Sequence, residues 1–425
     1  MNYKSVTLEL LRSGKNLFIT GGGGVGKTTL TRTIIAEYEA DAKRVAKLAS
    51  TGMAATLIGG QTLHSFLDLG IAKDREDLKA RGKFEIKKAI KKRISAMDLI
   101  VIDEISMVSD TLFDMVALRL QQAEFGGVVL VVGDFLQLPP VVRSSEVLRY
   151  AFDAKSWQHM AFETIELTHI YRTDDRDFIE LLHQIRFGIV DANVHEKLNS
   201  FIKPLPADLS GYTFLFGKND SAAQHNKKEL GAIDGDLYTK EVQIVKHTTK
   251  VTQQEIDRFM RDARIDALLE LKIGAPILFS RNAWNYYNGE RGVVVKIDES
   301  ALYIQKQDGK VVKVERVAQH KTEWKERLIE GKKELVEEPV VSLYHYPVQL
   351  AFGITIHKSQ GMSISDLIID TKEIFAPSQF YVAISRASNP HGLILIAPQR
   401  QWYELIFTNR RALEYVKGGH CDQKS

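Results

Sequence analysis

Short apolar runs alternate along the chain with stretches in which apolar residues recur at helical spacing. Apolar runs bounded by helical patterns predict buried strands. Strands that alternate with helices are typical of a parallel sheet with helices packed on its faces. We therefore expect a doubly wound α/β domain over residues 1–166, with a short insertion at about 67–95. Its strands are expected at residues 16–20, 44–50, 99–103, 128–134 and 164–167.

A second series of apolar runs follows in the other half of the chain. Between residues 268 and 343 the pattern changes to an alternation of period two, with turn signals at Asn288-Gly289 and Asp308-Gly309 that suit hairpins. The sequence thus predicts a second α/β domain, an antiparallel barrel inserted into it and a flexible tail. The second domain is expected at 167–267 and 344–416, with strands at 212–218, 348–354, 366–372 and 393–398, the barrel at 268–343 and the tail at 417–425.

Composition narrows the class of protein only slightly. The chain has 425 residues, of which 44% are apolar and 26% charged, as in ordinary globular proteins. A net charge of +3 permits a nucleic-acid partner without requiring one. The single cysteine, Cys421, excludes a disulfide framework, and the His420-Cys421 pair is interpreted as part of a frayed terminus. With no signal peptide or membrane-spanning run in the sequence, we expect a cytoplasmic location and no membrane partner.

The stretch "GGGGVGKT" at residues 21–28 follows a predicted strand and opens a predicted helix. Glycine tolerates the dihedral angles that let backbone N–H groups wrap a phosphate. Lys27 is expected to reach the β- and γ-phosphates of a nucleoside triphosphate, and Thr28 to hold Mg²⁺. The strand, loop and helix context disfavours the alternative, a glycine-rich turn without a ligand. The expected nucleotide-binding residues are Gly21, Gly22, Gly23, Gly24, Val25, Gly26, Lys27, Thr28 and Thr29.

A pair of acidic residues ends the predicted strand in "LIVIDEIS". Asp103 is expected to orient Mg²⁺, and Glu104 to polarise a water molecule against the γ-phosphate. Acidic residues that stabilise a helix N-terminus are the alternative. The presence of the phosphate loop in the same domain favours the catalytic interpretation.

Three further residues are candidates for sensing the γ-phosphate. Gln137 in "GDFLQLPPV" lies just beyond a predicted strand, although the same residues also suit a simple turn stiffened by Pro139 and Pro140. Arg172 in "LTHIYRT" and Arg386 in "QFYVAISRAS" have the fork geometry that binds phosphate oxygens. Most arginines form surface ion pairs instead, and the pattern alone places neither one at a cleft.

Seven motifs occur in the order found in superfamily-one helicases, and in detail the chain resembles the Pif-type (petite integration frequency) family in its compact bacterial form. The resemblance covers nearly the whole chain. It rests on "GGGGVGKT", "ASTGMAATLIGGQTLHSF", "LIVIDEISMVSDTLFDMV", "GDFLQLPPV", "ELTHIYR", "AFGITIHKSQGMS" and "QFYVAISRA". The segment "YYNGERGVV" resembles that family's inserted SH3-like barrel.

The resemblance implies two RecA-like domains that hydrolyse ATP at their interface and move 5′-to-3′ along single-stranded DNA. It implies that Lys27, Asp103, Glu104 and Gln137 act in catalysis, that Arg172 and Arg386 are arginine fingers, and that Gln360 and Gly361 lie towards the nucleotide. The family also has a glutamine that reads adenine near its N-terminus. No Gln precedes the phosphate loop in this sequence, so the adenine-reading residue stays unassigned.

The resemblance also implies DNA contacts in both domains, and "ITIHKSQG" at 354–361 is expected to start a helix that faces the cleft. Phe66 suits base stacking, although a core position is the alternative. Trp284, Tyr286 and Tyr287 are expected in the barrel core or rim, and the basic run at 83–97 on a solvated helix face. The expected DNA-binding residues are Thr62, His64, Ser65, Phe66, Pro139, Thr355, His357 and Lys358.

The sequence-based hypothesis is an ATP-dependent 5′-to-3′ DNA helicase of replication, recombination, repair or telomere-type maintenance, monomeric in the free state. Its expected partners are single-stranded DNA and tailed duplex or forked DNA, with quadruplex DNA as a further substrate. A RecD-like motor subunit of a nuclease or DNA-transfer complex is one alternative. A nucleotide-gated clamp that binds single-stranded DNA without unwinding is the alternative from another class.

Overall fold

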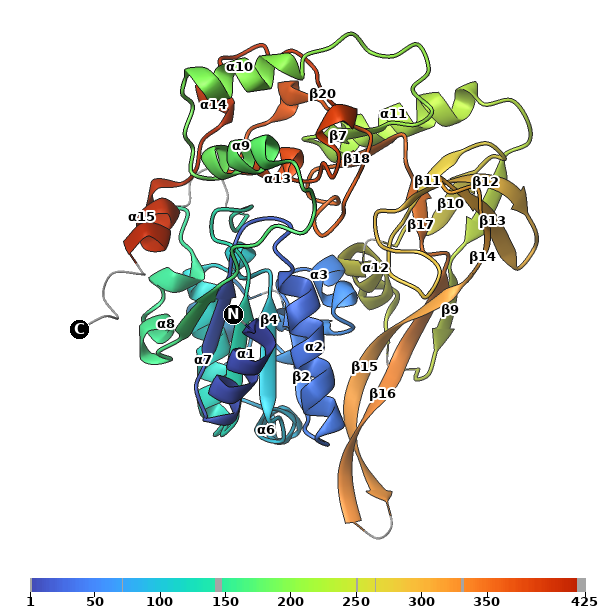
Figure 1. Cartoon of the computed structure of the whole chain (residues 1–425). Helices are drawn as coiled ribbons and strands as arrows, with labels where there is room; N and C mark the ends of the chain where they lie inside the picture. Colours follow the sequence, from blue (N-terminus) through green and yellow to red (C-terminus); the bar gives the residue numbers. More distant parts are fainter. Residues whose placement is uncertain are drawn as a thin grey trace.

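The computed structural model describes residues 2–70, 72–141, 147–249, 251–263, 265–329 and 332–418. Most of the predicted tail at 417–425, including His420 and Cys421, lies outside these residues. The chain forms two lobes, one above the other in Figure 1, with an elongated insertion beside them that reaches down along the lower lobe. None of the helices in the described ranges combines the length and apolar character that a bilayer crossing requires.

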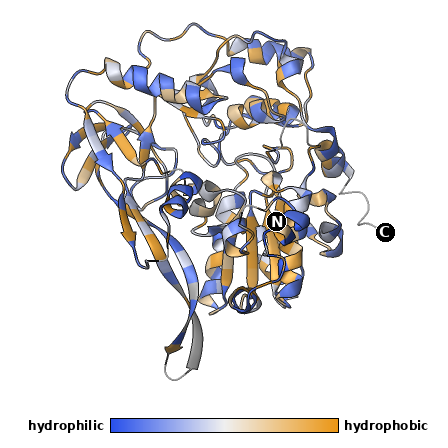
Figure 2. Ribbon diagram, turned by 180° about the vertical axis from the view of Figure 1, so that it is seen from behind, coloured by the Kyte–Doolittle hydropathy of each residue, from blue (hydrophilic) through white to orange (hydrophobic). Residues whose placement is uncertain are grey.

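The first lobe is built on a six-stranded parallel sheet in the order β3-β2-β4-β5-β1-β6. The strands β4 and β5 are buried along their whole length because helices cover both faces of the sheet. Figure 2 shows these strands as a continuous hydrophobic block. The strands are β1 (Leu17–Thr20), β2 (Val45–Ala49), β3 (Gln61–Thr62), β4 (Leu99–Asp103), β5 (Val128–Val132) and β6 (Glu163–Glu166). All five strands expected in this domain are therefore present.

Successive residues of β1 supply the two separate cores of the lobe. Phe18 packs into the cluster on one face of the sheet, while Leu17 and Ile19 pack into the cluster on the other face. A continuous apolar run is needed for this arrangement, because neither face meets water. The helices that cover the faces are α1 (Tyr3–Arg12), α2 (Lys27–Ala40), α3 (Gly52–Leu57), α4 (Leu63–Phe66), α5 (Arg75–Ala80), α6 (Lys88–Ser95), α7 (Asp110–Gln122) and α8 (Lys155–His159).

A buried arginine fastens the predicted insertion at 67–95 to the first lobe. Arg119 of α7 donates from Nε to the Leu67 carbonyl at 3.1 Å and from Nη1 to the Phe84 carbonyl at 2.8 Å. These bonds satisfy a guanidinium that is almost fully buried and hold both ends of the segment that contains α5. In the basic run at 83–97, Lys83 and Lys87 pair with Asp68, and Lys91 pairs with Glu124, as expected of a largely solvated face.

The second lobe has a four-stranded parallel sheet in the order β18-β7-β19-β20. Its core combines strand residues with the apolar faces of the helices that flank them. The strands are β7 (Thr213–Phe216), β18 (Gly353–Thr355), β19 (Leu367–Ile369) and β20 (Leu393–Leu395). The helices are α9 (Arg176–Arg186), α10 (Ala192–Ser200), α11 (Asn219–Ala232), α13 (Gln379–Ile384) and α14 (Trp402–Leu405).

The last helix, α15 (Arg410–Gly418), packs on the first lobe, although the sequence pattern grouped it with the second (Figure 1). The Tyr415 ring stacks on Phe152 with 4.2 Å between centroids, and the Tyr415 hydroxyl accepts a hydrogen bond from Trp157 Nε1 at 3.0 Å. Apolar periodicity reveals that a helix has a buried face but not which lobe buries it.

The insertion contains a five-stranded antiparallel sheet in the order β14-β13-β12-β11-β17, together with a long hairpin formed by β15 and β16. An antiparallel insertion is therefore present, while its SH3-like character stays a prediction. The strands are β8 (Tyr238–Glu241), β9 (Gln243–Lys246), β10 (Leu268–Leu271), β11 (Pro276–Phe279), β12 (Arg291–Ile297), β13 (Ala301–Lys306), β14 (Val311–Glu315), β15 (Val317–Ile329), β16 (Lys332–His345) and β17 (Val348–Leu350).

Two features of the insertion differ from the sequence pattern. The run expected as one strand at 348–354 is divided, since β17 pairs with β11 in the antiparallel sheet and β18 pairs with β7 in the parallel one. In addition, β8 pairs with β10 and β9 pairs with β16, so the expected start of the insertion at residue 268 falls between paired strands. Local hydrophobicity does not identify a strand's partner when both sheets are buried.

The insertion also touches the first lobe. Gln61 Nε2 donates to Thr322 Oγ1 of β15 at 2.6 Å, and Arg258 of α12 (Gln253–Ala263) donates to the Gly70 carbonyl at 3.1 Å. A Cβ atom at Gly52 would lie 1.7 Å from the Asp262 carbonyl oxygen, so α12 packs directly against α3. The insertion thus spans the distance between the second lobe, which carries it, and the first.

Candidate functional site

The predicted strand, glycine-rich loop and helix are present at the edge of the first sheet where the parallel strands end. β1 stops at Thr20 and α2 begins at Lys27, with Gly26 in a left-handed conformation at the helix N-cap. Gly24 also has a left-handed φ of 81°, and a Cβ atom there would lie 2.8 Å from Cβ of Arg172. Only glycine lets the loop bend this way while a second segment approaches it.

The Lys27 side chain folds back over this loop. Its ammonium group donates to the carbonyl oxygens of Gly21 at 2.6 Å and Gly22 at 2.8 Å. Burial lowers the pKa of Lys27, and the nearby carboxylates of Asp134 and Glu104 act in the opposite direction. The lysine is therefore held at the loop by contacts that an incoming phosphate group can replace.

The two acidic residues lie at the end of β4, as the sequence predicts. Asp103 is buried, and its Oδ1 accepts a hydrogen bond from the Glu104 N–H at 2.8 Å. Burial raises the pKa of Asp103 to about 7, and repulsion from Glu104 adds to the rise. Burial also raises the pKa of Glu104, while Lys27 and Arg386 oppose that rise.

These buried carboxylates fit a divalent cation. Mg²⁺ prefers hard oxygen ligands, and it would offset the repulsion that raises the pKa of Asp103. Thr28, the second residue of α2, is the predicted hydroxyl ligand on the neighbouring element. Among the described residues no group of three or more His, Cys, Asp or Glu side chains forms a metal site. A site made by Asp103 and Thr28 therefore needs further ligands from phosphate or water.

A buried ion pair joins the lobes beside the loop. Asp134, which follows β5, accepts two hydrogen bonds from Arg186 at the end of α9, at 2.9 and 3.0 Å. Burial alone would raise the pKa of Asp134, but the Arg186 guanidinium offsets burial and holds that pKa below its usual value. Gln137 is buried nearby, and its amide approaches Asp134 Oδ2 at 3.5 Å. The predicted sensor thus belongs to a cluster that spans both lobes.

Arg172 lies in the segment that connects the lobes and reaches the glycine loop. A Cβ atom placed on Gly23 would be 3.5 Å from its Nη1. Its Nε donates to Ser363 Oγ at 2.9 Å, and its Nη1 donates to the Ser385 carbonyl. Burial lowers the pKa of Arg172 to about 9, and the positive charge of Arg386 contributes. Two guanidinium groups close enough to repel each other lie where phosphate oxygens would offset their charge.

Tyr381 of α13 and Arg386, which follows that helix, face the same cleft. The Tyr381 hydroxyl accepts a hydrogen bond from the Gly23 N–H at 2.8 Å, the kind of contact that a phosphate oxygen makes with a loop amide. Arg386 is buried and bonds to the Val382 carbonyl at 2.9 Å and to Ser385 Oγ at 2.8 Å. Neither arginine singled out in the sequence forms a surface ion pair.

The segment 354–361 adopts a series of turns after β18 rather than the predicted helix. The Thr355 carbonyl accepts from the Ser359 N–H at 3.0 Å, and Thr355 Oγ1 accepts from the Lys358 N–H at 3.3 Å. Gly361 has a left-handed φ of 77°, and the series of turns ends there. His357 and Lys358 are half-buried, whereas Thr355 and Gln360 are buried. The polar side chains thus divide between an inner and an outer side of the turns.

In the first lobe, the predicted DNA-binding residues lie where the insertion meets α4. Thr62 caps α4 by accepting from the Ser65 N–H, and Ser65 is exposed. Burial lowers the pKa of His64, and Arg258 of the insertion adds to this effect. Pro139 is half-buried beyond Gln137. His64 lies near Arg258 of α12, and Gln61, which precedes Thr62, bonds to Thr322 of β15, so the insertion borders this surface.

Phe66 cannot be the stacking platform proposed from the sequence. Its side chain is only 2% exposed and belongs to the core of the first lobe, with the Arg93 guanidinium 4.6 Å from its ring centroid. Because α4 is a single turn, one residue of rotation decides between core and solvent, and the sequence pattern does not fix that rotation. The alternative weighed for Phe66, a core position, is correct.

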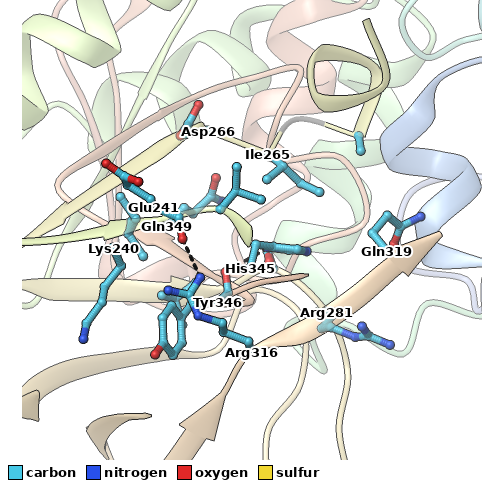
Figure 3. A pocket seen from close by; sticks show the side chains of 15 residues that line it. Lys240, Glu241, Ile265, Asp266, Arg281, Arg316, Gln319, His345, Tyr346 and Gln349 are labelled. Carbon is cyan, nitrogen blue, oxygen red and sulfur yellow. Dashed lines mark hydrogen bonds between the residues drawn. The ribbon is translucent and has the colours of Figure 1, made fainter. Parts of the chain in front are cut away.

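A small cavity in the insertion lies away from the glycine loop. Figure 3 shows its lining, in which Arg316 donates to the Glu241 carbonyl across the cavity. The cavity measures about 70 Å³, room for no more than a few water molecules. Burial lowers the pKa of His345 in its wall. The cavity lies between the bend that connects β8 to β9 and the β15–β16 hairpin, and it is too small for a nucleotide.

Four residues of the cleft were missed by sequence reasoning: Tyr171, Asp134, Arg186 and Tyr381. A signal existed for Arg186, which lies four residues after Leu182 on the buried face of α9. An arginine at an apolar position of an amphipathic helix implies a buried anion. Tyr171 is 71% exposed, and its ring lies 3.6 Å from where a Cβ on Gly26 would be. Its position beside the loop is visible only in three dimensions.

A family model for PIF1-like helicases matches residues 3–196. The ATP-dependent DNA helicase Pif1 of Campylobacter jejuni is 36% identical to this chain over 424 residues, which cover 95% of this chain and 93% of the relative. The chain belongs to the Pif1-like helicase family. The Pif1 helicase of Bdellovibrio bacteriovorus is 34% identical, covering 92% of this chain and 86% of that relative.

Solved Pif1 structures also match the two-lobed fold. Pif1 from Bacteroides sp in complex with ADP-AlF4 has a TM-score of 0.81 and 26% identity, covering 98% of this chain and 96% of that one. Bacteroides Pif1 bound to ssDNA matches with a TM-score of 0.66 at 26% identity and the same coverage. The predicted fold class, two RecA-like domains with an antiparallel insertion, is therefore confirmed, and so is the predicted family.

Proposed function

We propose that this Pif1-like chain hydrolyses ATP in the cleft between its lobes and uses the resulting lobe movement to travel 5′-to-3′ along single-stranded DNA and unwind duplex DNA. One observation carries the proposal: groups from both lobes and from their connector converge on one glycine loop. Tyr381 of the second lobe bonds to Gly23, and Arg172 of the connector lies against Gly23 and Gly24. A nucleotide held there contacts every part that has to move.

Each side chain of the cleft has a chemical task in this proposal. Lys27 binds the β- and γ-phosphates, and the loop N–H groups bind the remaining phosphate oxygens. Glu104 positions the attacking water and accepts its proton. Arg172 and Arg386 stabilise the charge that develops on the transferred phosphoryl group. Mg²⁺, when held by Thr28 and Asp103, supplies further charge stabilisation at the phosphates.

The turns at 354–361 are the proposed link between nucleotide and DNA. The Ser359 carbonyl is 3.5 Å from Arg386 Nη1, so the inner side of these turns contacts an arginine of the cleft. His357 and Lys358 lie on the outer side and are proposed to contact DNA phosphates, together with Thr62, His64 and Ser65 of the first lobe. Backbone contacts of this kind ignore base identity, as movement along any sequence requires.

Tyr171 is proposed to stack on the adenine base. Its ring is exposed and lies beside Gly26 at the helix end of the phosphate loop. The neighbouring His169 ring packs against it edge-on at 4.4 Å and limits its rotation. Stacking by Tyr171 would supply affinity for the base beside the phosphate loop.

Relatives support the DNA substrate. A Bacteroides Pif1 has been solved with ADP-AlF3 and ssDNA together, and another structure describes unwinding at forked dsDNA by two Pif1 helicases. We propose the same classes of DNA for this chain, and an intracellular role in replication, recombination or repair. We also propose that the chain is a monomer in the free state.

A strand-displacement assay tests the direction and the motor together. Duplexes with a 5′ single-stranded tail should be unwound in the presence of ATP and Mg²⁺, while duplexes with a 3′ tail should stay annealed. Lys27→Ala should abolish unwinding and hydrolysis but leave single-strand binding measurable, because the Lys27 ammonium group bonds to the glycine loop and not to the proposed DNA-binding residues that the structure describes. Unwinding of the 3′-tailed duplex alone would overturn the proposed direction. Full hydrolysis by Lys27→Ala would overturn the site.

A further inference from the structure

The loop between β11 and β12, residues 280–290, exposes two aromatic side chains. We call it the aromatic loop. Trp284 is 95% exposed and Tyr287 is 56% exposed, whereas Trp157 and Trp402 are almost fully buried in their lobes. A tryptophan side chain that stays exposed to water adds no hydrophobic contribution to the free energy of folding. Such a residue commonly marks a binding surface. The sequence-based expectation of a core or rim position holds for Tyr286, which stacks on Phe279, and leaves Trp284 without a structural role.

The aromatic loop is closed by its own hydrogen bonds. The Tyr286 ring anchors it, lying flat on Phe279 with 4.1 Å between centroids. Three bonds fix the backbone around Trp284: Ala283 N–H to the Tyr286 carbonyl at 2.8 Å, Asn288 N–H to Asn282 Oδ1 at 2.7 Å, and Tyr287 N–H to Glu290 Oε2 at 3.1 Å. Because the backbone is held in advance, a ligand that uses Trp284 loses little conformational entropy on binding.

The charge of the aromatic loop suits an anionic partner. The stretch "SRNAWNYYNG" holds Arg281 and no acidic residue, and Glu290, which follows it, pairs with Lys306 at 3.1 Å. Within the described ranges Arg281 has no carboxylate at ion-pair distance. Figure 3 shows its side chain at the edge of the cavity, apart from the bond between Arg316 and Glu241. A cation and an exposed aromatic ring on the same loop are the combination that binds single-stranded nucleic acid.

The aromatic loop is attached to the segment that links nucleotide and DNA. Gly289 has a left-handed φ of 87°, and a Cβ atom there would lie 2.9 Å from Cβ of Met362 and 3.1 Å from the Ser363 nitrogen. Ser363 in turn accepts a hydrogen bond from Arg172. Trp284 is therefore held by a loop that packs, without intervening space, on the continuation of the turns bearing His357 and Lys358.

We propose that Trp284 is a base-stacking platform that binds a nucleobase of the single strand whose phosphates contact the turns at 354–361. This proposal rests on the proposed function, since it requires a single strand in that position. An exposed tryptophan also suits a protein partner. Arg281 in the same loop and the packing of that loop on Met362 and Ser363, which directly follow the turns at 354–361, favour nucleic acid.

Equilibrium binding to two labelled oligonucleotides tests the proposal: oligothymidylate and a strand of the same length made of abasic nucleotides. Trp284→Ala should bind oligothymidylate between about 5 and about 150 times more weakly than the wild type, the loss of one stacked base. On the abasic strand the two proteins should bind equally, because no base is present to stack. Trp284→Phe should retain most of the oligothymidylate affinity.

Tyr403→Ala is the matched control, since Tyr403 is 65% exposed on α14 of the second lobe. It should bind both strands as the wild type does. Equal binding of oligothymidylate by Trp284→Ala and the wild type overturns the platform while leaving the proposed function intact, as does an equal loss on both strands. A wild-type protein that binds neither strand overturns the proposed function itself.

Discussion

The nucleotide cleft and the surface expected to face DNA differ in how their functional side chains are held. In the cleft, Lys27 is bonded to loop carbonyls, Arg172 to Ser363 and Ser385, and Tyr381 to the Gly23 amide. On the outer surface, Ser65 and Trp284 stand in solvent. The functional side chains of the cleft are hydrogen-bonded to other protein groups, whereas Ser65 and Trp284 on the outer surface are exposed to solvent.

This contrast has a physical consequence. A nucleotide must replace existing contacts between the lobes, so its binding energy changes how the lobes sit relative to each other. DNA adds contacts to a surface that is already formed, so its binding energy contributes to affinity and does not have to rearrange the lobes. Coupling between ATP and DNA is therefore expected to pass through the cleft contacts and to depend less on any one DNA contact.

The largest effect is expected from the arginines of the cleft. Arg172→Ala and Arg386→Ala should each slow ATP hydrolysis by about 10³–10⁵, because each removes a charge that stabilises the transferred phosphoryl group. Steady-state hydrolysis with saturating single-stranded DNA measures this, with DNA binding as the control that should persist. A fall of less than tenfold in either variant would place that arginine outside the chemistry.

The second effect concerns the buried ion pair between the lobes. Arg186→Ala leaves the buried Asp134 carboxylate without its guanidinium partner and should lower the free energy of unfolding by about 3–5 kcal/mol, to be measured by denaturant titration. The double variant Asp134→Ala with Arg186→Ala should recover part of this loss, since no unpaired charge remains. If the double variant loses as much free energy of unfolding as the two single variants together, the unpaired charge is not the cause of the loss in Arg186→Ala.

The smallest effect is expected at Tyr381, whose hydroxyl bonds to the phosphate loop in the cleft. Tyr381→Phe removes the hydroxyl that occupies the Gly23 amide, so a phosphate no longer has to displace it. ATP should bind more tightly by about 0.5–1.5 kcal/mol, measured by calorimetric titration of the nucleotide. Tyr403→Phe, on an exposed ring of α14, should not change this affinity. Weaker ATP binding by Tyr381→Phe would show that the hydroxyl assists the nucleotide.

The sequence predicted well those features of the fold and site that depend on one short stretch of the chain. A strand, a glycine loop and a helix place Lys27 and Thr28 together, and a buried strand delivers Asp103 and Glu104 to its end. The family resemblance supplied the roles. These features depend on neighbouring residues, so hydrophobic patterning and motif spacing are enough to locate them.

The parts that were missed depend on partners far away in the chain. Asp134 and Arg186 meet across 52 positions, and α15 returns from the second half of the sequence to the first lobe. Phe66 was assigned to the wrong side of a single helical turn. The run at 348–354 is mostly apolar, and its pattern gave no sign that it contributes strands to two sheets. In each case tertiary packing, which local patterns do not encode, decided the outcome.

The most direct test of coupling is the rate of ATP hydrolysis measured with and without single-stranded DNA. If the strand and the nucleotide share the segment that joins the turns at 354–361 to Arg172, adding oligothymidylate should raise the hydrolysis rate of the wild type strongly. The same addition should leave Lys27→Ala without hydrolysis. A wild-type rate that does not change when saturating single-stranded DNA is bound would contradict the account.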